Sequence, residues 1–306
     1  MTSDRKFCKL VRQEHAEVME VPLRGTFSHS FRKENSKKNR YSKIPCWDHS
    51  RVIVSPPQSL TIDQQDLDLS ELTITSEDIA STYIHANHVD GYKKTNKYIC
   101  AQTPLEDTWE TFFDVIWEQQ SCVIVSLTDV DRDDQKSYRV WVSPEGSETT
   151  FGKYVIKILE AREELSFSRT RVQITNTSTE TSRTVTNFWF TDWPDNSIPN
   201  GMEEFLDLRN EVNKEQSKLM KETENSSPTP GPIVVHCSTG TGWAGTFCAI
   251  DNALEQLDTE QKVSVPQIVL KIRSQRYSSV FLPEQYAFCY IVLRHVLLEA
   301  QDKQSN

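Results

Sequence analysis

The stretch HCSTGTGWAGTF, residues 236–247, joins a cysteine to a glycine-rich turn and the start of a helical pattern. The run PIVVHC at 232–237 predicts a buried strand before the turn, and the pattern at 244–257 predicts a helix after it. Amide groups of such a turn converge with the helix N-terminus and form an anion site. The same positive end lowers a cysteine pKa and favours the thiolate. The unit therefore predicts a nucleophilic Cys237 at an anion site, with an ordinary βα turn and an incidental buried cysteine as the alternative.

Short β-branched runs and longer helical patterns fill much of the remaining chain. Strands are predicted at 122–128, 154–159, 171–177, 184–190 and 232–237. Helices are predicted at 105–120, 201–220, 244–257, 263–276 and 283–300. Residues 213–232 change from charged helix formers to Ser, Pro and Gly, which is typical of a helix that ends in a surface loop. This mixture predicts an α/β fold with a central twisted mixed sheet flanked by helices.

Composition limits the classes of function. The chain has 306 residues, enough for one large or two small domains, and its apolar runs are too short for a membrane span or a signal peptide. The net charge of −10 argues against nucleic-acid binding. The stretch FRKENSKKNR at 31–40 is nevertheless basic, which indicates either a functional surface or an ordinary solvated face. Seven cysteines without a CxxC pair indicate reduced thiols and a cytosolic or nuclear location. The sequence indicates no metal, cofactor or membrane partner, and no particular oligomeric state.

Several segments resemble the motifs of the protein tyrosine phosphatases, in that family's order. VVHCSTGTGWAGTF is similar to the signature in which His-Cys is followed, after five residues, by Arg and then Ser or Thr. The other similar segments are KNRYSKIPCWDHSRV (38–52), YIHANHVDGY (83–92), YICAQTPLEDTWETFFDVIWEQ (98–119), WPDNSIP (193–199) and LPEQYAFCY (282–290). The resemblance implies a single phosphatase-like domain at 25–300, preceded by an arm or helix at 1–24 and followed by a tail at 301–306.

The resemblance also implies roles for matching residues. Cys237 matches the nucleophile, His236 its hydrogen-bonding neighbour, and Asp195 the general acid that protonates the leaving phenol. Tyr41 matches the aromatic wall beside a phosphotyrosine ring, with ordinary packing as the alternative. The remaining matches are Gln285 and Tyr286 at the end of the glutamine-bearing loop, and the phosphate-loop residues Ser238, Thr239, Gly240, Thr241, Gly242 and Trp243.

Four residues depart from the family pattern. Trp243 stands at the signature arginine and removes a bidentate cation suited to a phosphoryl group. Ala244 replaces the hydroxyl residue that stabilises the departing thiolate, and Phe281 replaces the glutamine that orients the hydrolytic water. Lys43 replaces the Asp that holds the substrate backbone, which inverts the charge there. The wide indole of Trp243 would either leave the pocket open or close its mouth.

These departures predict a pseudophosphatase that binds host signalling proteins, through a phosphotyrosine ligand or through a new surface. The alternative is a weakly active phosphatase in which a nearby cation, Lys136 or Arg276, substitutes for the arginine. A redox or purely structural role is a third alternative. The form IPCWDHSRV is most similar to the phosphatase-like proteins of bracoviruses, which parasitoid wasps inject into caterpillars. That resemblance implies expression in infected host cells, in the cytoplasm, and interference with phosphotyrosine signalling in immune cells.

Overall fold

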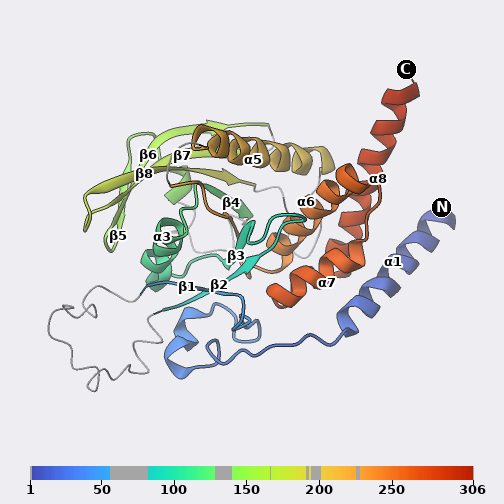
Figure 1. Ribbon diagram of the computed structural model, residues 1–306, viewed down its shortest axis with the longest axis horizontal. Coiled ribbons are helices and arrows are strands. Elements are labelled where there is room, and N and C mark those ends of the chain that lie inside the picture. The colour runs from blue at the N-terminus through green and yellow to red at the C-terminus, as the bar shows by residue number, and fades with distance from the viewer. Residues whose placement is uncertain are drawn as a thin grey trace.

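One nine-stranded sheet runs through the part of the chain that the computed structural model describes, residues 2–55, 82–127, 140–165, 167–190, 193, 201–224 and 228–305 (Figure 1). The strands are β1 (Arg51–Ile53), β2 (Tyr83–Val89), β3 (Tyr98–Gln102), β4 (Val123–Leu127), β5 (Glu148–Phe151), β6 (Tyr154–Glu163), β7 (Ser168–Asn176), β8 (Thr181–Trp189) and β9 (Ile233–Cys237). Their order across the sheet is β1-β2-β3-β9-β4-β8-β7-β6-β5. The neighbours β3, β9, β4 and β8 are parallel, and the outer strands pair antiparallel. The sheet is therefore mixed, as predicted.

Helices flank this sheet. They are α1 (Thr2–Glu20), η1 (Lys33–Lys38), η3 (Glu106–Thr108), α3 (Trp109–Glu118), α5 (Met202–Glu222), α6 (Gly242–Glu260), α7 (Val265–Gln275) and α8 (Pro283–Ser305). Helix α1 packs against α7 and α8, so that both ends of the chain lie on one side of the molecule (Figure 1). The predicted α/β class, with helices around a central mixed sheet, is confirmed.

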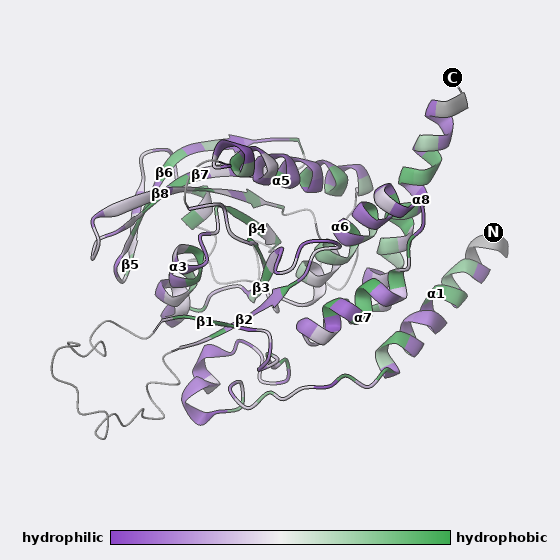
Figure 2. Ribbon diagram, in the orientation of Figure 1, coloured by the Kyte–Doolittle hydropathy of each residue, from purple (hydrophilic) through white to green (hydrophobic). Residues whose placement is uncertain are grey.

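The central strands are buried on both faces, and alternate residues enter two different hydrophobic clusters. On β9, Val235 and Cys237 face the cluster formed with α5, α6, α7 and α8, whereas Val234 faces the cluster that contains α3. Strand β4 divides in the same way, and Figure 2 shows it coloured as hydrophobic. This alternation is the period of two expected of a strand. It places Cys237 on the face of the sheet that α6 covers.

All five predicted strands and all five predicted helices are present. Helix α6 begins at Gly242 rather than at Ala244, because the amide of Gly245 already donates to the carbonyl of Thr241 (3.0 Å) and closes the first turn within the loop. Helix α5 ends at Glu222, inside the predicted run-out at 213–232, of which residues 225–227 lie outside the described part. Strands β1, β2, β3 and β5 were not predicted. The boundaries at 24 and 300 remain predictions, and α8 continues through the second of them.

Candidate functional site

Cys237 ends the central strand β9, and the sheet fixes its position from both sides. Its register partners are Gln102 on β3 and Leu127 on β4. The carbonyl of Cys237 accepts the amides of Thr103 (2.8 Å) and Gly240 (3.0 Å), so the chain turns sharply directly after the strand. Gly240 has a φ of +66°, and a Cβ there would lie 2.2 Å from the backbone carbon of Ala101. Only glycine fits this turn.

Amide groups of the turn surround the Cys237 thiol. The amide of Gly240 lies 3.2 Å from Sγ. Burial raises the pKa of the thiol, and hydrogen bonds from the amide of Ala244, the hydroxyl of Thr239 and the amides of Gly240 and Thr241 oppose this only in part. The lowered pKa predicted for Cys237 from the sequence is therefore wrong for this structure, because burial disfavours the thiolate more than the amides favour it.

His236, the residue before Cys237, is buried as a neutral side chain. Its Nε2 lies 2.7 Å from Oγ of Ser126, which itself donates to Asn187, and its Nδ1 lies 3.3 Å from Oγ1 of Thr103. Burial, and then the charge of Arg40, lowers the pKa of His236 to about 3. The imidazole therefore bonds the end of β9 to Ser126 on β4 and to Thr103 after β3, and it carries no charge at neutral pH.

Trp243 is packed into the hydrophobic core. It is 9% exposed and belongs to the cluster on the α6 face. Its indole stacks on that of Trp193, with ring centroids 5.5 Å apart and planes at 13°. Trp193 in turn makes edge contacts with Phe205 and Phe288. The indole therefore contributes to an aromatic cluster that joins α5, α6 and α8.

Tyr41 and Lys43 lie at the exposed rim. The hydroxyl of Tyr41, whose side chain is 43% exposed, lies 2.9 Å from Oγ of Ser238, the first residue after the cysteine. Lys43 is exposed on the same segment. The structure thus brings the predicted aromatic wall to the loop.

The end of the 282–290 segment packs against the loop from another side. A Cβ on Gly242 would lie 2.7 Å from Nε2 of Gln285 and 3.1 Å from Cε1 of Phe281. Gln285 is buried, with its Oε1 accepting the amide of Leu282 (3.3 Å), whereas Phe281 is 39% exposed. Tyr286 points away into the core, where its hydroxyl donates to Glu14 of α1 (2.7 Å). Asp195 lies outside the described residues.

Arg276 supports the loop from behind, a role that the sequence reasoning did not assign. The side chain is fully buried. Its guanidinium contacts the carbonyls of Thr239 (3.1 Å) and Gly240 (2.9 Å), Oδ1 of Asn87 (2.7 Å), Nδ1 of His85 (3.0 Å) and Sγ of Cys46 (2.8 Å). All three guanidinium nitrogens are thus engaged with the protein. The guanidinium holds the loop backbone and does not point into the cradle of amides.

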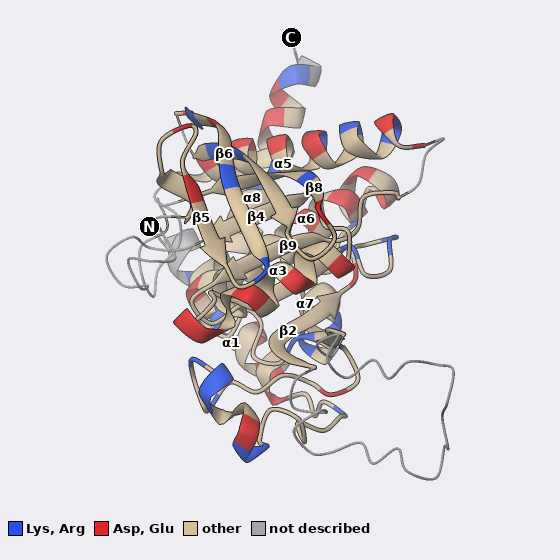
Figure 3. Cartoon of the chain, turned by 90° about the vertical axis from the view of Figure 1, so that its left-hand side faces the viewer, with Lys and Arg blue, Asp and Glu red and all other residues tan. Residues whose placement is uncertain are grey.

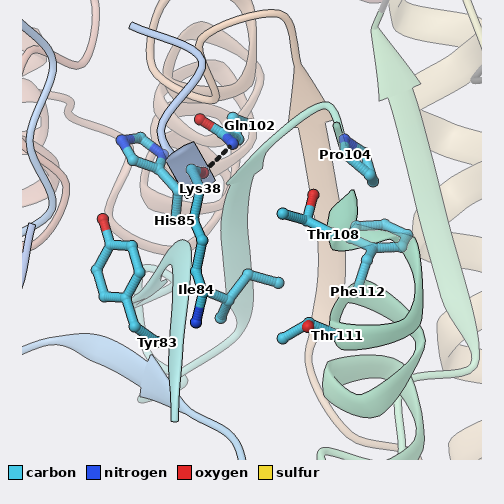
Figure 4. A pocket seen from close by; sticks show the side chains of 9 residues that line it. All are labelled: Lys38, Tyr83, Ile84, His85, Gln102, Pro104, Thr108, Thr111 and Phe112. Carbon is cyan, nitrogen blue, oxygen red and sulfur yellow. Dashed lines mark hydrogen bonds between the residues drawn. The ribbon is translucent and has the colours of Figure 1, made fainter. Parts of the chain in front are cut away.

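A small hollow lies beside the site, between β2 and the start of α3 (Figure 4). Ile84 lines it from one side and Thr108 and Phe112 from the other. Gln102, the register partner of Cys237, donates from its Nε2 to the carbonyl of Lys38 (2.8 Å) at its edge. Burial lowers the pKa of Lys38. The basic segment 31–40 is therefore not simply a solvated face.

The model of the protein-tyrosine phosphatase family matches residues 35–295. With the mixed sheet and the cysteine loop described above, this match shows that the chain belongs to the protein-tyrosine phosphatase family. It is 50% identical to Tyrosine phosphatase H3 of Microplitis demolitor bracovirus (isolate Webb), over 99% of this chain and 94% of that one. It is 42% identical to Tyrosine phosphatase-like protein H1 of the same virus, over 94% of this chain and 81% of that one. Human tyrosine-protein phosphatase non-receptor type 9 is 33% identical, over 96% of this chain and 46% of that one.

Two further findings concern the described residues only. None of their helices has the length and apolar character needed to cross a membrane. Their His, Cys, Asp and Glu side chains form no group of three or more with the arrangement of a metal site.

Proposed function

We propose that this chain is a pseudophosphatase, a phosphatase-family protein that binds signalling proteins without catalysing phosphate hydrolysis. The observation that carries the proposal is the placement of Trp243, which stands where the family signature has arginine and stacks on Trp193 (5.5 Å). An arginine directed at a transferring phosphoryl group contributes a factor of roughly 10³–10⁵ in rate in other systems. A neutral indole engaged in the core does not replace that charge.

Three further positions support the proposal. Ala244 offers no hydroxyl to the departing thiolate, and Phe281 offers no polar group to orient a water. Losing one oxyanion donor alone costs about 10²–10³ in rate in other enzymes. Lys43, exposed at the rim, presents a positive charge where the family pattern has a carboxylate.

Of the two cations considered as substitutes, the structure describes Arg276, and its placement does not support catalysis. Arg276 is fully buried and donates to the outside of the loop, at the carbonyls of Thr239 and Gly240. Lys136 lies outside the described residues. The raised pKa of Cys237 also favours the protonated thiol, which is a poor nucleophile.

A weakly active tyrosine phosphatase, with Cys237 as nucleophile and Asp195 as general acid, is the second candidate. The amide cradle at Sγ and the buried His236 favour it, because both belong to the family's chemistry. The printed name of the bracovirus relative at 50% identity, Tyrosine phosphatase H3, also favours it. Turnover of an aryl phosphate separates the two candidates.

The binding role rests on the loop and its rim. The amides around Cys237 form an anion site, and the exposed ring of Tyr41 beside Ser238 is placed to contact an aromatic ligand. The similarity to bracovirus proteins supports a host phosphotyrosine protein, or another host signalling protein, as the partner. We place the protein in the cytoplasm of infected host cells, where such binding would interfere with phosphotyrosine signalling in immune cells.

A pull-down from caterpillar haemocyte lysate tests this binding role. Half of the lysate is first treated with an active phosphatase. The proposal predicts that the resin retains a protein from the untreated half. If the ligand is a phosphotyrosine, the pretreated half gives no retained protein, and if another surface is used, both halves give it. Tyr41→Ala should weaken a phosphotyrosine-dependent capture, whereas Leu297→Ala, an exposed apolar residue of α8, should not. Retention of no protein above blank resin from either half contradicts the proposal.

A further inference from the structure

The hydroxyl of Thr239 lies inside the loop, among the groups that would contact a bound anion. Its Oγ1 lies 3.2 Å from the amide nitrogen of Thr241 and 3.4 Å from that of Gly242. It also lies 3.9 Å from Sγ of Cys237 and 2.9 Å from Oγ1 of Thr241. The hydroxyl of Thr239 therefore contacts both the thiol and two of the loop amides.

These contacts satisfy donors that an anion would otherwise use. Backbone N–H groups at the start of a helix have no partner within the helix, and they bind a side-chain oxygen, water or an anion. Here Oγ1 of Thr239 accepts the amides of Thr241 and Gly242, at the start of α6. The same two amides cannot donate fully to an oxyanion while the hydroxyl remains in place.

Contacts within the protein hold this arrangement of the loop. Arg276 binds the carbonyls of Thr239 and Gly240 from behind, and Thr241 is fully buried with its hydroxyl against that of Thr239. The backbone is thus fixed, whereas the Thr239 side chain is only partly buried, and another χ1 rotamer would move its hydroxyl away from the amides. Rotation of one side chain is the movement that would open the amides to an anion.

We propose that the Thr239 hydroxyl is an intramolecular ligand of the loop, and that oxyanions bind only by displacing it. The inference rests on the proposed function, in that it concerns the anion site of a loop that binds rather than hydrolyses. Thr239 is then a specificity-determining residue. A ligand that contacts this loop through phosphate alone must compete with the hydroxyl, and a ligand with further contacts at the rim has the advantage.

Calorimetric titration with inorganic phosphate and with tungstate tests the competition. Thr239→Ala removes the hydroxyl, and we expect it to bind both anions about tenfold more tightly, because the anion no longer displaces two hydrogen bonds. Thr239→Ser keeps the hydroxyl and is the matched control, with the affinity of the unmodified protein expected. Equal affinities in the unmodified protein and Thr239→Ala, including undetectable binding by both, overturn the proposal.

Amide hydrogen exchange provides a second test that does not depend on anion binding. Thr239→Val keeps the shape of the side chain but lacks the acceptor, so the amides of Thr241 and Gly242 should exchange several-fold faster than in the unmodified protein. Unchanged exchange would show that the hydroxyl does not hold these amides, and would overturn the proposal. Aryl phosphate turnover is measured on the same proteins. Turnover by the unmodified protein would refute the proposed function while leaving the anion affinities to decide the role of Thr239.

Discussion

At the scale of single residues, the stacked pair Trp193 and Trp243 distinguishes this site most clearly. Stacked aromatic pairs contribute about 0.5–1.5 kcal/mol beyond the area that they bury. Trp243 also joins the core cluster, so its contribution extends to the packing of α6 against α5 and α8. The indole therefore has a structural role at the position that we match, from the sequence resemblance, to the arginine of the family signature.

Trp243→Ala is expected to lower the free energy of unfolding by about 3–5 kcal/mol, the usual cost of deleting a buried tryptophan. Urea denaturation measures the change. Phe281→Ala, at an aromatic residue of the same site that is 39% exposed, is the matched control and should cost less than about 1 kcal/mol. Equal losses for the two variants would show that Trp243 is not part of the core.

The sequence located this site but not its internal contacts. Cys237, His236 and the glycine turn were found because strand, turn and helix signals are adjacent along the chain. The pKa of Cys237 and the packing of Trp243 were not found, because both depend on segments far away in the sequence, such as the one that carries Trp193. Asp195 remains a prediction.

At the scale of elements, the strands that were predicted are rich in β-branched residues, and two central strands that were missed contain buried polar ones. In β2, Asn87 donates to the carbonyl of Trp47 (3.0 Å), and His85 contacts that of Ile44 (2.6 Å). In β3, Gln102 accepts the amide of Arg40 (2.9 Å). These side chains bind the loop that carries Tyr41, so the apolar pattern of a strand is interrupted where the site needs support.

One carboxylate of helix α1 binds two tyrosines of α8. Glu14 accepts the hydroxyls of Tyr286 (2.7 Å) and Tyr290 (2.5 Å). Glu14→Ala leaves both hydroxyls without this acceptor, so we expect a loss of about 1–3 kcal/mol in the free energy of unfolding, measured in urea. Glu17→Ala, on the same helix but bonded only to Gln13 at the surface, should change it by less than about 0.5 kcal/mol. A Glu14 effect no larger than that of Glu17 contradicts the role of this contact.

At the scale of the whole molecule, charge is kept away from the centre of the sheet. Strands β4 and β9 carry no Lys, Arg, Asp or Glu (Figure 3). Two buried histidines, His85 and His236, remain neutral instead, and burial lowers the pKa of each from 6.5 to about 3. The charge of Arg276 also lowers that of His85, and the charge of Arg40 that of His236. His85 contacts Arg276, which holds the loop backbone, and His236 directly precedes Cys237, so both neutral histidines belong to the surroundings of the site.

These histidines predict a loss of stability in mild acid. Below pH 6.5 the unfolded chain binds protons that the folded protein does not, so the free energy of unfolding falls as the pH falls from 6.5 toward 3. Between pH 7 and pH 5 each histidine should account for about 2 kcal/mol, measured by urea denaturation. His236→Asn should reduce this pH dependence, and His49→Asn, at an exposed histidine, should not. A dependence that is the same in all three proteins would mean that His236 is not buried as a neutral group.

The central claim is that the chain keeps the phosphatase fold without its chemistry, and turnover of para-nitrophenyl phosphate tests it most directly. The unmodified protein is assayed beside Cys237→Ser and beside an active member of the family. We predict that the unmodified protein and Cys237→Ser give the same rate, because Trp243 supplies no charge to the phosphoryl group and burial raises the pKa of the Cys237 thiol. A Cys237-dependent rate within about a hundredfold of the active member would contradict the account.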